Sequence, residues 1–158
     1  MKYRFFTFIV SFLIIANVVK AEQKNLVQFV NTLQGTDSHF GLSYGNTYAT
    51  TAMPYAMHTW EAQTGKNGEG WKYQYSADKI RGFQQAHQCS PWVSDYAVYS
   101  LMPVVGKLIV NQDERAAAFS HANEIGQPHY YSVKFNNGML TEMAPTERGA
   151  HLRFTYPK

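Results

Sequence analysis

The 158-residue sequence contains a single cysteine, Cys89, so no disulfide can form within the chain. It has no Gly-x-Ser-x-Gly sequence, which excludes the nucleophile turn of the α/β-hydrolases. Its six histidines are scattered without the spacing of metal-binding motifs. No pair of carboxylates stands out as the opposed acid and base of a hydrolase. Burial must therefore hold the fold together, and the sequence by itself does not point to a catalytic residue.

Long apolar runs are also scarce. A short basic region precedes one apolar run over residues 5–19, and small or branched residues follow it up to Ala21. This pattern predicts a secretory signal peptide over residues 1–21. The alternative is a membrane anchor, but the run is shorter than the ~20 apolar residues that a spanning helix needs. We therefore expect an exported protein, periplasmic or at the cell surface or secreted, with one domain over residues 22–158 and no membrane span.

Net charge is lacking once the predicted signal peptide is set aside. Three of the 14 basic residues, Lys2, Arg4 and Lys20, lie in it and no acidic residue does. The remaining chain has 11 basic and 11 acidic residues. No basic surface is expected, which argues against nucleic acid and anionic membranes as partners.

Aromatic residues are abundant, with 11 Tyr, 10 Phe and 3 Trp, and they favour strands. Asn136-Asn137-Gly138 between two short apolar runs is typical of a hairpin, and Leu152, Phe154 and Tyr156 fall on one face of a last strand. Residues 35–45 and 64–70 are expected to form a loop and a turn. The pattern predicts an antiparallel all-β sandwich with strands at 49–60 (interrupted at Pro54), 71–75, 80–86, 96–110 (bent at Pro103 and Gly106), 131–135 and 139–143, and a strand or a helical turn at 26–33.

One loop carries most of the functional information. The segment from His87 to Tyr96 combines an imidazole, an amide, a carboxylate, an indole and a phenol between two apolar runs. Polar groups of this kind bind sugar hydroxyls while an aromatic face covers the C–H surface of the sugar. The alternative is that Trp92 packs in the core, Asp95 caps a turn and His87 is a buried histidine with its hydrogen bonds satisfied.

Two further places are candidates. Gly45 and Asn46 lie in a loop whose backbone could approach a ligand, although a tight turn entering a strand explains them equally. Trp60 and Trp71 flank the glycine-rich turn. Each could be a stacking platform for a sugar, or simply part of the core.

Three stretches give the chain a resemblance to a known family: VNTLQGTDSHFGLSYGNTYATTAMPYAM, TGKNGEGWKYQYSADKIRGFQQAHQCSPWVSDYAVYSLMPV and TEMAPTERGAHLRFTYPK. In this order they resemble the N-terminal β-sandwich domain of glycoside hydrolase family 92, exported exo-acting α-mannosidases. The resemblance runs from about Phe29 to the last residue. It implies a supersandwich fold of the galactose-mutarotase-like kind, followed in the family by a larger helical domain that this chain lacks.

The resemblance also implies an activity and a site. Family members are calcium-dependent and inverting, and they act on α-mannosides of N-glycans or mannans. The catalytic acid and base and most calcium ligands belong to the helical domain, so this chain alone is expected to be inactive and to form one wall of the mannose site. Its proposed substrate-binding residues, with no catalytic residue and no metal ligand among them, are Trp92, Asp95, His87, Gln88, Trp71, Asn46 and Gly45.

Two other interpretations stay open. The chain could be a free-standing carbohydrate-binding module, or a non-functional gene fragment. The last expected strand is followed directly by Tyr156-Pro157-Lys158, which predicts an unpaired sheet edge and a half-covered core, as in a truncated sequence.

Overall fold

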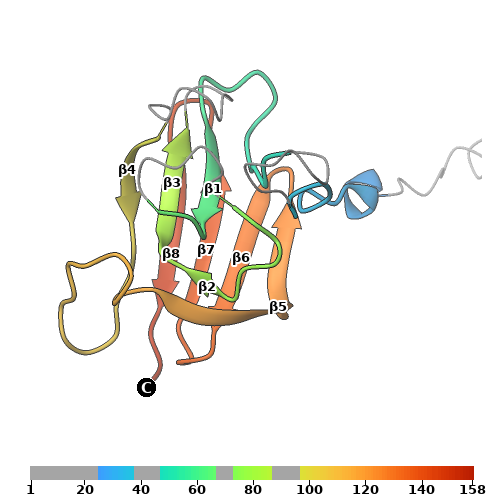
Figure 1. The fold of residues 1–158 in the computed structure, drawn as a ribbon. Helices are drawn as coiled ribbons and strands as arrows, with labels where there is room; N and C mark the ends of the chain where they lie inside the picture. Colours follow the sequence, from blue (N-terminus) through green and yellow to red (C-terminus); the bar gives the residue numbers. More distant parts are fainter. Residues whose placement is uncertain (1–24, 38–46, 67–72, 87–96) are drawn as a thin grey trace, which may run out of the picture.

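The computed structural model describes residues 25–37, 47–66, 73–86 and 97–158 (Figure 1). A short 3₁₀ helix near the start is followed by strands that are all antiparallel to their neighbours. In chain order the elements are η1 (Leu26–Phe29), β1 (Thr59–Gln63), β2 (Lys79–Ile80), β3 (Gly82–Ala86), β4 (Ala97–Leu101), β5 (Ala117–Gln127), β6 (Tyr130–Phe135), β7 (Leu140–Pro145) and β8 (Ala150–Thr155).

The strands form two sheets packed face to face. The smaller sheet has the order β1-β3-β4 and the larger one the order β2-β5-β6-β7-β8. The smaller sheet lies in front of the larger one in Figure 1. The predicted antiparallel β-sandwich is therefore confirmed.

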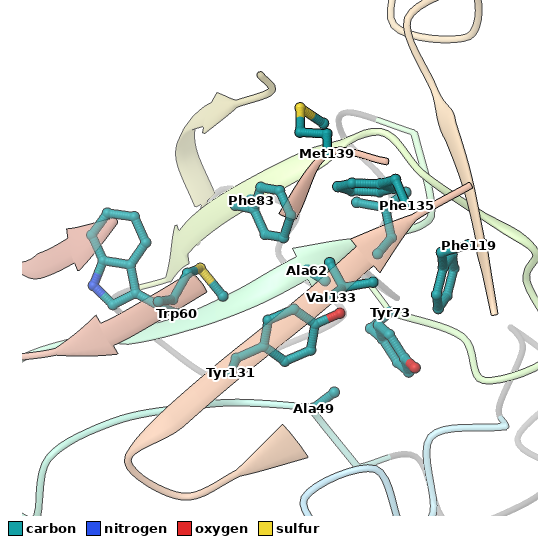
Figure 2. Packing of buried hydrophobic residues seen from close by; sticks show 12 residues of the cluster. Ala49, Trp60, Ala62, Tyr73, Phe83, Phe119, Tyr131, Val133, Phe135 and Met139 are labelled. Carbon is teal, nitrogen blue, oxygen red and sulfur yellow. The ribbon is translucent and has the colours of Figure 1, made fainter. Parts of the chain in front are cut away.

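The hydrophobic core fills the space between the sheets. Phe83 of β3, fully buried, makes edge-to-face contacts with Tyr131 and Phe135 of β6, with ring centroids 6.2 and 6.3 Å apart. Figure 2 shows these rings and Trp60 between the strands of the two layers. Trp60 is only 3% exposed, so its place is in the core and the stacking-platform interpretation of this residue is wrong.

The hairpin signature is confirmed. β6 and β7 pair directly, and the turn between them is closed by hydrogen bonds from Gly138 N to Phe135 O (2.9 Å) and from Phe135 N to Met139 O (2.8 Å). Gly138 has a φ of +88°, a left-handed conformation that glycine adopts without steric cost.

Two other predictions near the chain ends are also confirmed. β8 alternates between half-buried residues, among them Leu152 and Phe154, and exposed ones, and Leu152 packs against the core; Tyr156 of the predicted face lies beyond the strand and is 51% exposed. At the other end, the helical-turn alternative for residues 26–33 is correct, because Leu26–Phe29 form a 3₁₀ turn capped by Asn25.

Two predicted strands are wrong. Between residues 49 and 58 the chain pairs only through an isolated bridge from Thr51 to Trp60, and β1 begins at Thr59. Met53 to Ala56 form a turn instead, because proline at its second position cannot donate a ladder hydrogen bond. Residues 73–75, the described part of the predicted strand 71–75, do not form a strand either.

Two other apolar runs are broken. Residues 80–86 contribute to both sheets, because the chain leaves the larger sheet at Ile80 and enters the smaller one at Gly82. Gly82 permits this passage, since a Cβ there would lie 2.0 Å from the Ser100 hydroxyl oxygen. The run 96–110 forms a strand only as far as Leu101, two residues before Pro103.

The sequence did not predict β5, the longest strand. Polar residues interrupt its apolar ones without a clear alternation, and a register irregularity interrupts its pairing with β6 between Phe119 and Glu124. Glu124 is opposite Val133, which is fully buried. Directly opposite residues point to the same side of a sheet. The irregularity therefore directs the Glu124 side chain toward the core and leaves Ile125 49% exposed.

Candidate functional site

The seven predicted substrate-binding residues lie outside the described residues. They fall in the segments 38–46 (Gly45, Asn46), 67–72 (Trp71) and 87–96 (His87, Gln88, Trp92, Asp95). Their roles therefore stay predictions. The structure does describe the residues from which these segments start and to which they return.

Segment 87–96 joins two paired strands. Ala86 at the end of β3 and Ala97 at the start of β4 are register partners, and Thr59 of β1 is opposite Ala86 on its other side. The residues on either side of the segment are thus paired at one end of the smaller sheet.

A cluster of rings lies at the same end of the smaller sheet. The Trp60 ring centroid is 6.2 Å from that of His58 and 6.0 Å from that of Tyr99. Tyr99 is 44% exposed, whereas the other two rings are buried. Among the described residues, no hydrogen-bond partner reaches His58 Nε2 or Trp60 Nε1. These three rings pack against one another near Ala86 and Ala97, and the Tyr99 ring leaves aromatic surface exposed there.

Segment 38–46 is closed at its base by Gly35 and Thr47. Thr47 N donates to Gly35 O (3.1 Å), and the Thr47 hydroxyl donates to Gln34 O (2.5 Å). Gly35 has a φ of +76°, and a Cβ there would lie 2.7 Å from Thr47 Oγ1. Only glycine fits this position, so the approach of the two segment ends depends on it.

A pocket of about 260 Å³ opens beside Gly35. Two amide side chains, a carboxylate and the Tyr75 ring contribute to its lining. The backbone holds this ring in place, because Tyr75 N donates to Thr36 O (3.1 Å). Amides, a carboxylate and a flat ring are groups that bind sugars. The complete lining consists of Asn31, Leu33, Gln34, Gly35, Asp37 and Tyr75.

Behind this pocket, Tyr75 stacks on His121 of β5. The two rings are almost parallel, 5° apart, with centroids separated by 3.9 Å. His121 Nε2 is 2.6 Å from Tyr75 O, and its Nδ1 is 2.6 Å from Glu124 Oε2. One imidazole thus connects the pocket wall to a carboxylate with no exposed side-chain surface.

Glu124 is the centre of a buried hydrogen-bond network. The Tyr73 hydroxyl lies 2.9 Å from both carboxylate oxygens, and the Tyr131 hydroxyl donates to Oε1 at 2.6 Å. Burial, followed by the charge of Glu124, raises the pKa of Tyr73 and the pKa of Tyr131 well above their usual range. Both hydroxyls therefore stay protonated and can donate to the carboxylate.

These raised pKa values predict sensitivity to alkali. A phenol ionises near pH 10 in the unfolded chain and only at higher pH in the folded one. The free energy of unfolding should therefore be unaffected by these groups below pH 10 and fall as the pH rises further. Urea titrations between pH 8 and pH 11 would measure this. The Tyr73→Phe/Tyr131→Phe double variant should show a shallower decline, and an equally steep one would contradict the assignment.

The sequence did not single out this pocket. Gln34 and Asp37 are in the first family-like string, Asp37 within the predicted loop 35–45, but nothing in their spacing indicates Tyr75 as a neighbour. Tyr75 is brought there by its hydrogen bond to Thr36 and by His121, a residue of the unpredicted strand β5.

The part of the chain that the structure describes contains no group of three or more His, Cys, Asp or Glu side chains that could hold a metal ion. None of its helices is long and apolar enough to cross a membrane. The predicted signal peptide lies outside these residues.

The chain is similar in sequence and in structure to known glycosidases. Residues 29–158 match the family described as the glycosyl hydrolase family 92 N-terminal domain. The structure resembles a family GH92 inverting mannosidase from Bacteroides thetaiotaomicron, with a TM-score of 0.80 and 43% identity over 88% of this chain and 19% of that one. A second, a GH92 α-mannosidase from the same organism, gives a TM-score of 0.72 and 25% identity over 85% of this chain and 19% of that one.

A curated relative is more distant. It is an "Uncharacterized secreted glycosidase" from Arthroderma benhamiae, 20% identical over 92% of this chain and 19% of its own length. The chain thus spans about a fifth of the length of these relatives.

Proposed function

Because this chain belongs to glycosyl hydrolase family 92, where it matches the N-terminal domain, we propose that it is the N-terminal part of an exported, inverting exo-α-mannosidase. The observation that carries the proposal is the likeness to an inverting mannosidase at 43% identity over 88% of the chain. The relative named as a secreted glycosidase supports export. The substrates we propose are α-mannosides of N-glycans or mannans.

In this proposal the chain supplies one wall of the mannose site. Trp92 packs on the sugar face and Asp95 accepts hydrogen bonds from neighbouring hydroxyls, with His87 and Gln88 shaping the same loop. Asn46 and Gly45 face the pocket from segment 38–46, and Trp71 flanks the leaving group. The closure of segment 38–46 by Gly35 and Thr47, next to a pocket with polar and aromatic lining, supports this role.

The bond-breaking groups are assigned to the rest of the polypeptide. An inverting glycosidase needs one carboxylic acid to protonate the leaving oxygen and one carboxylate to activate water on the opposite face. We propose that both are in the helical domain that follows in the family, together with most of the calcium ligands. Bound calcium would coordinate the oxygen atoms of sugar hydroxyls and so hold the sugar in place. Among the described residues, no group of three or more His, Cys, Asp or Glu side chains could hold a metal ion.

The test begins with the reading frame beyond the codon for Lys158. If it continues into helical sequence, the continuous polypeptide should hydrolyse 4-nitrophenyl α-mannoside and release β-mannose first, which proton NMR detects. Trp92→Ala and Asp95→Asn should each lower kcat/KM by about 30-fold or more, because a buried anchor is worth about 2 kcal/mol or more. Tyr156→Ala removes a 51% exposed ring beyond β8 and should leave the rate unchanged.

Two results would contradict the proposal. One is turnover of the aryl mannoside by the 158-residue chain alone, since its wall of the site lacks the acid and base. The other is release of α-mannose first by the longer polypeptide. If the frame ends instead and the chain binds mannobiose saturably with loss of binding in Trp92→Ala, the carbohydrate-binding module is the correct interpretation.

A further inference from the structure

A second pocket lies on the face of the larger sheet that points away from the core. On this face β6, β7 and β8 present a row of Tyr130, Ala144 and His151, next to a row that contains Glu142 and Arg153. These five residues line a pocket of about 250 Å³. None of them belongs to the segments of the proposed mannose site.

The shape of the pocket follows from the register. Ala144 is directly opposite His151, and Tyr130 is on the strand at its other side. Two strand spacings of about 4.8 Å each separate the two ring-bearing strands. The small Ala144 side chain therefore leaves a depression between Tyr130 and His151.

An ion pair with two hydrogen bonds lies at one side of this depression. Arg153 Nε and Nη2 donate to the two oxygens of Glu142, both at 2.6 Å, and the Tyr130 hydroxyl donates to Glu142 Oε1 at 2.8 Å. Arg153, and then Tyr130, lower the pKa of Glu142, so the carboxylate is ionised at neutral pH. The Glu142 side chain is 12% exposed and the Arg153 side chain 73% exposed.

The charges limit the class of ligand. Glu142 repels an anion and Arg153 repels a cation, and the pair together carries no net charge. The guanidinium has more N–H groups than these two bonds use, and carboxylate oxygens accept more than one hydrogen bond. Donors and acceptors side by side, next to a phenol ring, match neighbouring hydroxyls and a C–H face on a neutral ligand. We propose that this pocket is a second carbohydrate site, which binds a neutral pyranose ring on the outward face of β6–β8.

The proposal is tested by NMR titration of the chain with methyl α-mannopyranoside, with inorganic phosphate as the anionic probe. We expect saturable shifts of the Ala144, His151 and Arg153 amides with a Kd on the order of millimolar, because a shallow pocket covers little ligand surface. Ala144→Leu should weaken binding roughly tenfold or more, since the added side chain fills the depression. Thr155→Leu places the same side chain on the same face outside the pocket and should bind as the unaltered chain does.

The outcomes separate this site from the mannose site. Trp92→Ala should leave the Ala144 shifts intact, whereas Ala144→Leu should leave mannosidase activity of the longer polypeptide intact. The second site is wrong if these amides do not shift with sugar at concentrations on the order of tens of millimolar, or if phosphate shifts them and sugar does not. It is also wrong if Ala144→Leu and Thr155→Leu bind sugar equally.

Discussion

Replacing Glu124 by alanine should lower the free energy of unfolding by about 3–5 kcal/mol, because it removes the one group that a set of buried donors shares. Tyr73, Tyr131 and His121 all bond to this carboxylate. Without it, the hydroxyls of the buried Tyr73 and Tyr131 remain where water is largely excluded, and each unsatisfied group costs about 1–3 kcal/mol, whereas the His121 side chain is 29% exposed and can turn to water. Urea unfolding followed by tryptophan fluorescence would measure the change.

The exposed Glu114 provides the matched control. Glu114→Ala makes the same substitution at the surface, where changes are usually within about 0.5 kcal/mol. Glu124→Gln keeps the shape and two hydrogen-bonding atoms, so it should be less damaging than alanine. Equal stabilities of the two alanine variants would show that the network contributes nothing to folding.

Replacing Phe83 by alanine should have an effect of similar size, about 3–5 kcal/mol, because it leaves a cavity between the two sheets. The Phe83 ring is fully buried and contacts Tyr131 and Phe135 of the opposite layer. Phe83 is also part of β3, the strand that leads into segment 87–96. In the longer polypeptide the loss of stability should therefore be accompanied by weaker mannoside binding, measured as a higher KM.

Phe29 is the control for this substitution. Its ring is 74% exposed on the 3₁₀ turn, so Phe29→Ala should change stability by less than about 0.5 kcal/mol. Phe83→Leu retains most of the buried volume and should cost less than Phe83→Ala. If Phe83→Ala were as stable as Phe29→Ala, the two sheets would not share a common core.

The features that the sequence predicted correctly are local. The Asn136-Asn137-Gly138 turn and the alternation of β8 depend on residues within a few positions of one another, and both are as expected. The 43% identity to a solved mannosidase also agrees with the family that the three strings indicated.

The features that the sequence missed depend on distant partners. Alternation along β5 would put Ile125 in the core, but the irregular pairing with β6 puts Glu124 there instead. Such a reversal is favourable because Tyr73, which is remote in sequence, and the nearer Tyr131 supply hydrogen-bond donors. The pocket next to Gly35 is hidden for the same reason, since Tyr75 reaches it through Thr36. Trp92 and Asp95 lie outside the described residues and stay predictions.

The strand order of the larger sheet also has a consequence for the order of folding. β5, β6, β7 and β8 are neighbours both in space and along the chain, so their contacts close short loops and form quickly. In the described part of the chain, the smaller sheet buries apolar side chains such as Phe83 against this meander. During synthesis from the N-terminus, the segments of the proposed mannose site are made before the larger sheet. The smaller sheet that carries segment 87–96 can pack on the larger sheet only after residues 117–155 have been made.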